Sequence, residues 1–260
     1  MNLFDHDHGT ITDGDIADAF AKLGIARGDC LFAHTSLVHF GRPACEHGEL
    51  LAAVNECFRD AVGESGTIGF PTFTYSFCKG EDYDTLTSRS DMGSFNEYFR
   101  TLPDVRRTLH PLFSAAVAGA KRDDWCDVGS DSFGPDSIFA KLVKDDAWLV
   151  CFGVDAMTFV HHVEQCRGVN YRFHKQFSGN IILDGRPLHT AATFFCRRLD
   201  WEVTYDLRRL FRDLEAAGMR RRVAVGPTEI SAVRARHVYD VICRGLFVDP
   251  YYLLAGNPCR

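Results

Sequence analysis

One segment of the sequence carries a histidine and a carboxylate at a spacing that suits acid–base chemistry. His161 and Glu164 stand three residues apart in the stretch 158–165. We predict this stretch to be helical, so the two side chains share one face. A carboxylate beside an imidazole raises the pKa of the imidazole, by about 1–3 units when the pair is close and shielded. Starting from an ordinary value of about 6.5, the pair predicts a general base that works near neutral pH.

The pair has two other interpretations on the residues alone. A histidine and a glutamate three apart on a helix often form only an exposed ion pair. They also make half of a metal site, but HxxEH would need a histidine at Gln165, and HExxH is absent. The ten cysteines are scattered, with no CxxC pair. Several lie in apolar runs, so we expect reduced, structural thiols and no bound metal.

Polar turns follow three of the predicted strands. The turn His34-Thr35-Ser36-Leu37 follows an apolar run, a second turn covers 71–75, and a third follows Gly153. Ligands of open parallel sheets gather outside the carboxyl ends of the strands. A Thr-Ser turn there either presents N–H groups and hydroxyls to a phosphate or only turns the chain and caps the next element. The GxGxxG and GxxxxGKS phosphate motifs are absent, as is the GxSxG nucleophile elbow.

Short apolar runs alternate with segments of helical periodicity along the chain. We predict strands at 30–33, 67–70, 115–118, 147–152 and 222–225, and helices at 13–23, 50–61, 94–100, 137–144, 158–166, 207–217 and 235–246. This alternation predicts one domain over 1–260, a layered α/β/α fold with a largely parallel central sheet. Asp184-Gly185 between two apolar runs predicts a hairpin with a type I′ turn. The irregular segment 76–92 is a loop or a small lobe over the site.

The composition excludes several classes of protein. Hydrophobic residues make up 46% and charged residues 25% of the chain, as in ordinary globular proteins. A net charge of -6 excludes a generally basic surface for nucleic acid. No apolar run approaches the length of a membrane span, and the N-terminus lacks the pattern of a signal peptide. We therefore expect a cytoplasmic protein that binds neither nucleic acid nor membrane.

Six segments, taken in order, resemble the aminoglycoside 3-N-acetyltransferase family. They are 32–37, 63–75, 92–94, 107–111 with Ser114, 132–139 and 158–164. Each is short, whereas six in this order and spacing are specific; the C-terminal third resembles the family more loosely. The resemblance implies an α/β fold unlike that of the GNAT acetyltransferases, acetyl-CoA as acyl donor, and an amine of an aminoglycoside or related amino sugar as acceptor.

The resemblance also implies roles for single residues. It makes His161 and Glu164 the catalytic pair. The residues that it implies for binding the CoA arm are His34, Thr35, Ser36, Leu37, Ser114 and Phe133. For the acceptor we name Tyr75, Asp82 and Asp84, because acidic residues crowd the segment after Tyr75 and suit a cationic amino sugar. A solvated surface loop is the other interpretation of these charges.

Two departures from the family pattern leave the acceptor open. Phe113 stands where the family commonly has a polar residue, and the segment 165–177 differs from that of drug-modifying members. One alternative is N-acetylation of a nucleotide-linked amino sugar for a surface polysaccharide. Another is a CoA-binding protein without turnover, although such a protein has no need of the pair His161 and Glu164. The number of subunits is also open, a homo-oligomer included.

The turn that contains Ser36 provides the first testable prediction. If its hydroxyl and backbone groups hold the CoA arm, Ser36→Ala should raise the KM for acetyl-CoA more than it lowers kcat. Steady-state kinetics with varied acetyl-CoA measures this. An unchanged KM would mean that the turn only shapes the chain.

Overall fold

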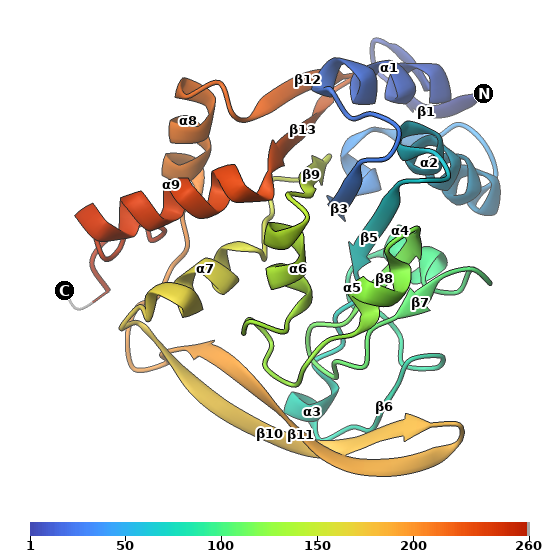
Figure 1. Ribbon diagram of the computed structural model, residues 1–260. Coiled ribbons are helices and arrows are strands. Elements are labelled where there is room, and N and C mark those ends of the chain that lie inside the picture. Colours follow the sequence, from blue (N-terminus) through green and yellow to red (C-terminus); the bar gives the residue numbers. More distant parts are fainter. Residues whose placement is uncertain (259–260) are drawn as a thin grey trace.

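The computed structural model describes residues 1–258. Within them the largest sheet has seven strands in the order β12-β13-β9-β3-β5-β8-β7 (Figure 1). These strands are β3 (Cys30–Thr35), β5 (Thr67–Pro71), β7 (Arg106–Arg107), β8 (Ala115–Gly119), β9 (Trp148–Phe152), β12 (Arg221–Val225) and β13 (Thr228–Arg234). The strands predicted from the apolar runs are all present, whereas β7 and β13 were not predicted.

The strand directions correct one part of the predicted fold. The α/β class is confirmed, but only the centre of the sheet, β9-β3-β5, is parallel. The flanking pairs are antiparallel. At one flank the cause is local: β12 and β13 are separated only by Gly226 and Pro227. A parallel connection needs a crossover of a dozen or more residues, so this short turn forces an antiparallel pair.

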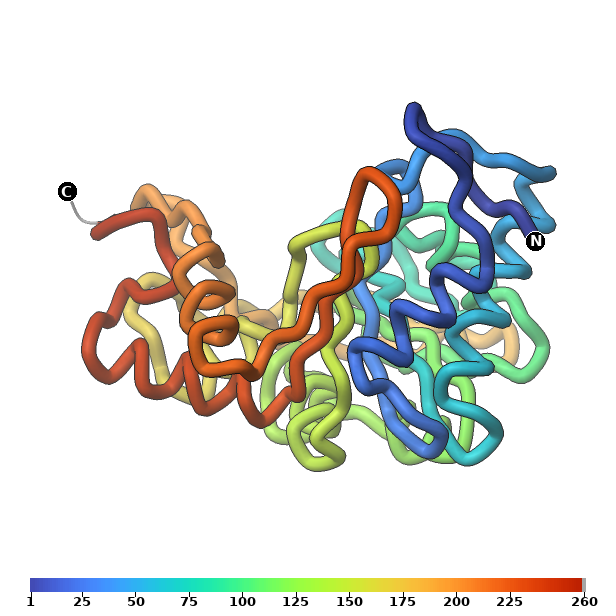
Figure 2. Tube along the Cα trace, turned by 90° about the horizontal axis from the view of Figure 1, so that it is seen from above, coloured from blue at the N-terminus to red at the C-terminus, as the bar shows by residue number. Residues whose placement is uncertain are grey.

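Helices cover both faces of the sheet. The helices of eight or more residues are α1 (Asp13–Leu23), α2 (His47–Val62), α7 (Val160–Arg167), α8 (Arg208–Ala216) and α9 (Ala235–Val248). Shorter ones are α3 (Ser76–Lys79), α4 (Ser94–Phe99), α5 (Arg122–Cys126), α6 (Ile138–Lys144) and the single 3-10 turn η1 (Leu37–His39). Figure 2 shows the C-terminal helices and the N-terminal helices on opposite sides of the β12–β13 hairpin.

The alternation of side chains along β3 explains the two layers. Leu31 and Ala33 pack in the core with α1, α2 and α4. Cys30 and Phe32 point the other way, into the core formed with α5, α6, α7 and α9. Successive side chains of a strand point to opposite faces, so a continuous apolar run is needed where both faces are covered. The α/β/α layering predicted from these runs is therefore present.

Local signals in the sequence set several helix ends. Thr12 caps α1 by accepting from the N–H of Asp15, whose carboxylate accepts from the N–H of Thr12 in return. Such a capping box satisfies two backbone groups that the first helical turn leaves free. The helix ends at Gly24, which has a left-handed conformation with φ 81°. The Ser137 hydroxyl caps α6 in the same manner.

A long hairpin forms a second sheet beside the carboxyl ends of the parallel strands. It consists of β10 (Arg172–Leu183) and β11 (Arg186–Arg197), with β6 (Tyr83–Asp84) paired to β10 (Figure 1). Asp184 and Gly185 have φ values of 49° and 74°, as a type I′ turn requires. The predicted turn is confirmed, but the hairpin is longer than predicted. The irregular segment 76–92 contributes α3 and β6 to this small lobe.

A third sheet lies near the N-terminus. This small N-terminal sheet contains β1 (Asn2–His6), β2 (Gly9–Thr12) and β4 (Arg42–Pro43).

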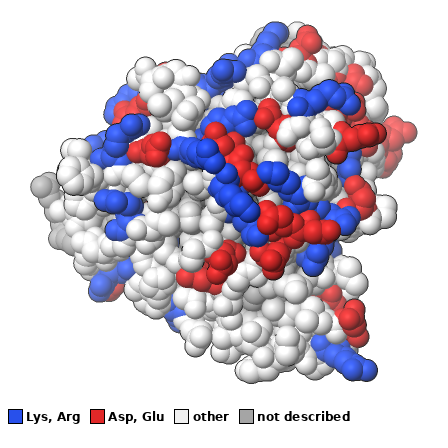
Figure 3. Space-filling model, viewed as in Figure 1, with Lys and Arg blue, Asp and Glu red and all other residues white. Residues whose placement is uncertain are grey.

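Within residues 1–258 the cysteines are free thiols, and Cys259 lies outside the described residues. In the same part of the chain, no helix is long and apolar enough to cross a membrane. Figure 3 shows positive and negative side chains mixed over the face viewed there.

Phe58 of α2 is a hub of the first core, which gives a stability prediction. Its ring centroid lies 5.0 Å from those of Phe20 and Phe70 and 5.1 Å from that of Phe152. Phe58→Ala should lower the free energy of unfolding by about 3–5 kcal/mol, because it leaves a cavity among rigid rings. Urea denaturation measures the loss. The matched control Phe247→Ala removes a side chain that is 82% exposed and should change stability by no more than about 0.5 kcal/mol. Equal losses in the two variants would contradict this picture of the core.

Candidate active site

Helix α7 brings His161 and Glu164 into direct contact. Nδ1 of His161 lies 2.7 Å from Oε2 of Glu164. The Glu164 side chain is fully buried, and that of His161 is 21% exposed. A fully buried carboxylate is not half of a surface ion pair, so the geometry matches the predicted acid–base pair rather than the exposed one.

The Glu164 carboxylate is also held by three groups from outside its helix. The Tyr171 hydroxyl donates to Oε1 at 2.7 Å, and the Tyr205 hydroxyl donates to the same oxygen at 2.8 Å. Nε of Arg172 lies 3.0 Å from Oε2. Burial alone would raise the pKa of Glu164, but the hydrogen bond from His161, the Arg172 cation and the hydrogen bond from the Tyr171 hydroxyl lower it. The carboxylate therefore stays ionised although it is buried.

Arg172, the first residue of β10, completes the cluster. Its Nη2 lies 2.9 Å from Nδ1 of His161, and its Nε donates to the Tyr205 hydroxyl at 2.7 Å. Nη1 donates to the carbonyl oxygen of Phe195. The guanidinium also lies over the rings of Tyr205, Phe195 and Phe133, between 5.5 and 5.9 Å from their centroids. These contacts leave the side chain 4% exposed.

The pKa of His161 corrects the prediction made from the pair alone. Burial lowers the pKa of His161, and the Arg172 cation lowers it further. Together they outweigh the hydrogen bond and charge of Glu164, which act in the opposite direction. The predicted rise was wrong, because the spacing reveals the carboxylate but neither the burial nor the cation. His161 is consequently uncharged at neutral pH and able to accept a proton.

The contact with Glu164 indicates which ring nitrogen of His161 carries the proton. A lone pair on Nδ1 would repel the carboxylate oxygen 2.7 Å away, so Nδ1 carries the hydrogen and donates to Glu164. Nε2 then keeps its lone pair, and it has no hydrogen-bond partner within residues 1–258. A neutral imidazole in this tautomer accepts protons at Nε2.

The end of β3 lies beside this pair, and the predicted turn is in part strand, because His34 and Thr35 belong to β3. Nε2 of His34 is 3.0 Å from Oγ1 of Thr158, just before α7. Burial and the nearby His161 lower the pKa of His34 to about 4, so His34 is neutral. The Thr35 hydroxyl donates to Asn96, and the Ser36 N–H donates to the carbonyl of β9 residue Phe152 at 2.9 Å.

Two groups of this turn thus serve the fold rather than a ligand. The Thr35 hydroxyl and the Ser36 N–H are both used within the protein. The Ser36 hydroxyl makes no hydrogen bond to residues 1–258, and Leu37 begins the turn η1. The Ser36 hydroxyl therefore remains available to a ligand.

A line of aromatic rings connects two more of the predicted residues, Phe133 and Tyr75, to His161. The Phe133 ring is 5.4 Å from that of His161 and 4.7 Å from that of Phe113. Phe113 in turn lies 5.2 Å from Tyr75, whose backbone is left-handed with φ 54°. Burial raises the pKa of Tyr75 to about 12, so its hydroxyl stays protonated. Phe133 thus contacts His161, whereas Tyr75 is connected to it through the rings of Phe113 and Phe133.

Ser114 belongs to a different environment. It is fully buried, and its hydroxyl donates to the carbonyl oxygen of Thr72 at 2.6 Å. Nε of Arg107 donates to the same hydroxyl at 3.2 Å. The serine therefore sits in a buried network between β5 and β8 instead of facing the base.

The acidic residues predicted at the acceptor lie apart from the base. Asp84 is in β6, which pairs with Ile181 and Ile182 of β10. Ile181 is nine residues beyond Arg172 in that strand, or about 30 Å at ~3.3 Å per residue. Asp82 accepts a hydrogen bond from Asn180 at 3.0 Å. The structure does not bring Asp82 and Asp84 together with His161.

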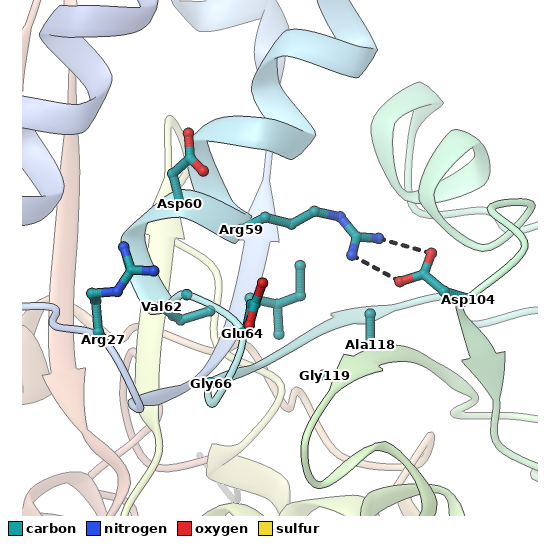
Figure 4. Close-up of a pocket in the computed structure, with 11 residues that line it drawn as sticks. Arg27, Arg59, Asp60, Val62, Glu64, Gly66, Asp104, Ala118 and Gly119 are labelled. Atoms are coloured by element: carbon teal, nitrogen blue, oxygen red, sulfur yellow. Dashed lines mark hydrogen bonds and ion pairs between the residues drawn. The ribbon is translucent and has the colours of Figure 1, made fainter.

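A separate hollow of about 430 Å³ opens at the amino end of β5 (Figure 4). The end of α2, the start of β5 and the end of β8 line it. Figure 4 shows Arg59 and Asp104 facing each other in a double ion pair, with Nη1–Oδ2 and Nη2–Oδ1 distances of 2.8 and 3.1 Å. His34 belongs to the carboxyl half of β3, so the hollow lies at the opposite edge of the sheet from the candidate site.

Comparison with known proteins identifies the family. Residues 32–246 match the family model described as aminoglycoside 3-N-acetyltransferase. The chain belongs to this family. Aminoglycoside N(3)-acetyltransferase VII of Streptomyces paromomycinus is 27% identical, over 92% of this chain and 93% of its own length.

Two solved structures share the fold of this acetyltransferase-family chain. Aminoglycoside acetyltransferase AAC(3)-IVa has a TM-score of 0.77 at 23% identity, covering 96% of this chain and 93% of its own. AAC-IIIb, solved with CoASH, has a TM-score of 0.78 at 21% identity, covering 95% of this chain and 99% of its own. The six motifs thus led to the correct family, and the α/β fold expected from it is confirmed.

Sequence reasoning missed the residues that surround Glu164 in this family member. Tyr171 and Arg172 follow α7 directly, in the segment that we had set apart as unlike drug-modifying members. A tyrosine and an arginine after a helix that bears a buried acid were the available signal. Tyr205 stands 41 residues from Glu164, and nothing in the sequence connects the two.

The electrostatics of the cluster predict the ionisation of His161. Its pKa should lie below 6.5, and Glu164→Gln should lower it further, because the imidazolium loses its counter-charge. NMR titration of the labelled imidazole measures both values. Glu64→Gln is the matched control, since Glu64 is exposed at the other edge of the sheet and should leave the titration unchanged. A pKa that rises in Glu164→Gln would contradict the assigned contacts.

Proposed function

We propose that the protein transfers an acetyl group from acetyl-CoA to an amine of an aminoglycoside or a related amino sugar. Membership of a family of acyltransferases supports the reaction class, and a relative of the same fold was solved with CoASH. The observation that carries the proposal is the contact of His161 with a fully buried, ionised Glu164, which leaves Nε2 of His161 to accept a proton.

The proposed reaction is a direct transfer without a covalent enzyme intermediate. The acceptor nitrogen attacks the thioester carbon and forms the new C–N bond, while His161 Nε2 takes the proton that the nitrogen loses. The tetrahedral adduct then expels the CoA thiolate, which receives the proton back from the imidazolium. Glu164 stabilises the imidazolium between these two proton transfers. Alignment of the substrates and general base catalysis supply the rate enhancement.

We assign the acyl donor to the side of the base where the β3 turn lies. His34 and the Ser36 hydroxyl stand there, and the Phe133 ring contacts His161. A flat aromatic surface beside the base suits the thin pantetheine arm of CoA. Thr35 and Leu37 adjoin His34 and Ser36 in the chain, whereas Ser114 lies in the buried network with Thr72 and Arg107 and is not part of this proposed donor site.

The acceptor side takes its residues from the small lobe. Tyr75 joins the aromatic line next to the base. Asp82 and Asp84 lie along the same hairpin but farther away, so in this proposal they attract a cationic acceptor instead of touching the reacting amine.

Removal of the base tests the proposal. His161→Ala should lower kcat by about a hundredfold or more, since general base catalysis contributes ~10²–10⁴. The assay is CoA release from acetyl-CoA with a panel of aminoglycosides and amino sugars. His8→Ala serves as the control, because His8 is exposed near the N-terminus.

Two outcomes would contradict the proposal. One is near-normal turnover in His161→Ala. The other is a wild-type protein that releases no CoA with any amine of the panel. His162→Ala is unsuitable as a control, because His162 is buried and its Nδ1 lies 2.7 Å from the carbonyl oxygen of Phe133.

A further inference from the structure

Arg172 is the one group of the cluster whose contacts oppose the effect of Glu164 on His161. We propose that Arg172 is a positioning residue for the acetyl transfer: its guanidinium balances the Glu164 carboxylate and keeps His161 in the neutral form that accepts a proton. The inference rests on the proposed function for its catalytic meaning, but its physical content concerns only this chain.

The contacts of the guanidinium hold it in one place. Nε reaches Oε2 of Glu164 at 3.0 Å and the Tyr205 hydroxyl at 2.7 Å, and Nη1 reaches the backbone of Phe195. Nη2 is left 2.9 Å from Nδ1 of His161. Partners engage Nε and Nη1 and hold Nη2 beside the imidazole, so the cation has little freedom to leave the ring.

Nη2 acts on His161 through its charge. In the tautomer that donates to Glu164, Nδ1 carries a hydrogen and has no lone pair for a second donor. Two N–H groups facing each other at 2.9 Å gain nothing as a hydrogen bond. The cation at this distance penalises a second proton on the ring, whereas the carboxylate at 2.7 Å favours it.

The other titratable groups facing His161 are uncharged. From β3, His34 is neutral, since its pKa is lowered to about 4. From the segments before β10 and α8, burial and Glu164 raise the pKa values of Tyr171 and Tyr205, so both hydroxyls stay protonated and uncharged. Among residues 1–258, Glu164 and Arg172 are therefore the groups that bring a full charge to the imidazole.

Without Arg172, only burial would oppose the effect of the carboxylate on the imidazole. A close carboxylate stabilises imidazolium, and a low-dielectric setting strengthens the effect. A larger fraction of the rings would then hold the proton at neutral pH, and the fraction able to act as a base would fall. The same carboxylate is nevertheless needed to orient the ring and to stabilise the imidazolium during the transfer. Arg172 allows both functions in one site.

The test is NMR titration of His161 combined with the pH profile of kcat/KM. Arg172→Met removes the charge and keeps much of the length, so the pKa of His161 should rise by about one unit or more. The rising limb of the profile should move upward by the same amount, with activity lost near neutral pH and partly recovered at high pH. In Arg172→Lys the cation remains, and the limb should stay near its wild-type position although kcat falls with the loss of the fork.

Arg220→Met is the matched control. Arg220 has a side chain 2% exposed, pairs with Glu215 and Asp155, and lies over the ring of Phe211. Its removal should lower stability to urea without moving the titration of His161. If Arg172→Met behaves in the same way, with reduced stability and an unchanged pKa, Arg172 is only structural and the proposal is overturned.

The two readouts separate the failure of this inference from failure of the proposed function. A raised pKa of His161 in a protein that acetylates no amine would support the role of Arg172 and refute the function. Turnover by the wild-type protein, together with an unchanged pKa of His161 in Arg172→Met, would support the function and refute the role of Arg172. Should Arg172→Met not fold, Arg172→Lys carries the test, because a raised pKa of His161 despite the retained cation would overturn the proposal.

Discussion

An ionised carboxylate with no access to water is the constraint around which this site is built. Removing a charge from water costs several kcal/mol unless hydrogen bonds and an opposite charge replace the lost hydration. For Glu164 that replacement comes from its own helix through His161, from the start of β10 through Arg172, and from Tyr171 and Tyr205. The segments that supply these groups therefore meet around one side chain, because its buried charge needs all of these partners.

The sheet and the hairpin make this convergence possible. The parallel pair β3 and β9 places His34 next to Thr158, and α7 starts two residues later. The hairpin begins at Arg172, so its first residue enters the site while its far end reaches β6 of the small lobe. A rigid strand is a more exact support for a positioning cation than a loop, because its backbone is fixed by the ladder of hydrogen bonds to β11.

The same arrangement explains why His161 is neutral rather than charged. A carboxylate close to a histidine is usually taken to raise the pKa of the histidine, and in water that is the dominant effect. Here burial and the Arg172 cation lower the pKa of His161, and together they outweigh the carboxylate. A general base works best when its pKa lies near the operating pH and it is already deprotonated. A triad of imidazole, carboxylate and guanidinium meets that condition while keeping the ring oriented.

Much of the fold could be predicted from the sequence, because its signals are local. The capping box at Thr12, the Asp184-Gly185 turn and the apolar run of β9 each depend on a few neighbouring residues. The strand β13 escaped prediction, since its polar start hides a run that is buried only when it pairs with β9. The mixed direction of the sheet escaped for a similar reason: pairing partners are chosen in three dimensions.

The candidate site also has features that the sequence determined and features that only the tertiary structure decided. The three-residue spacing on one helix determined that His161 and Glu164 share a face, and six ordered motifs determined the family. Only the tertiary structure decided that Glu164 is buried away from water and that Arg172 and Tyr205 reach it from 8 and 41 residues away. It also decided that Asp84 lies far from His161. Burial and charge are sums over everything that surrounds a group in space, so the direction of the His161 pKa was beyond the reach of spacing along the chain.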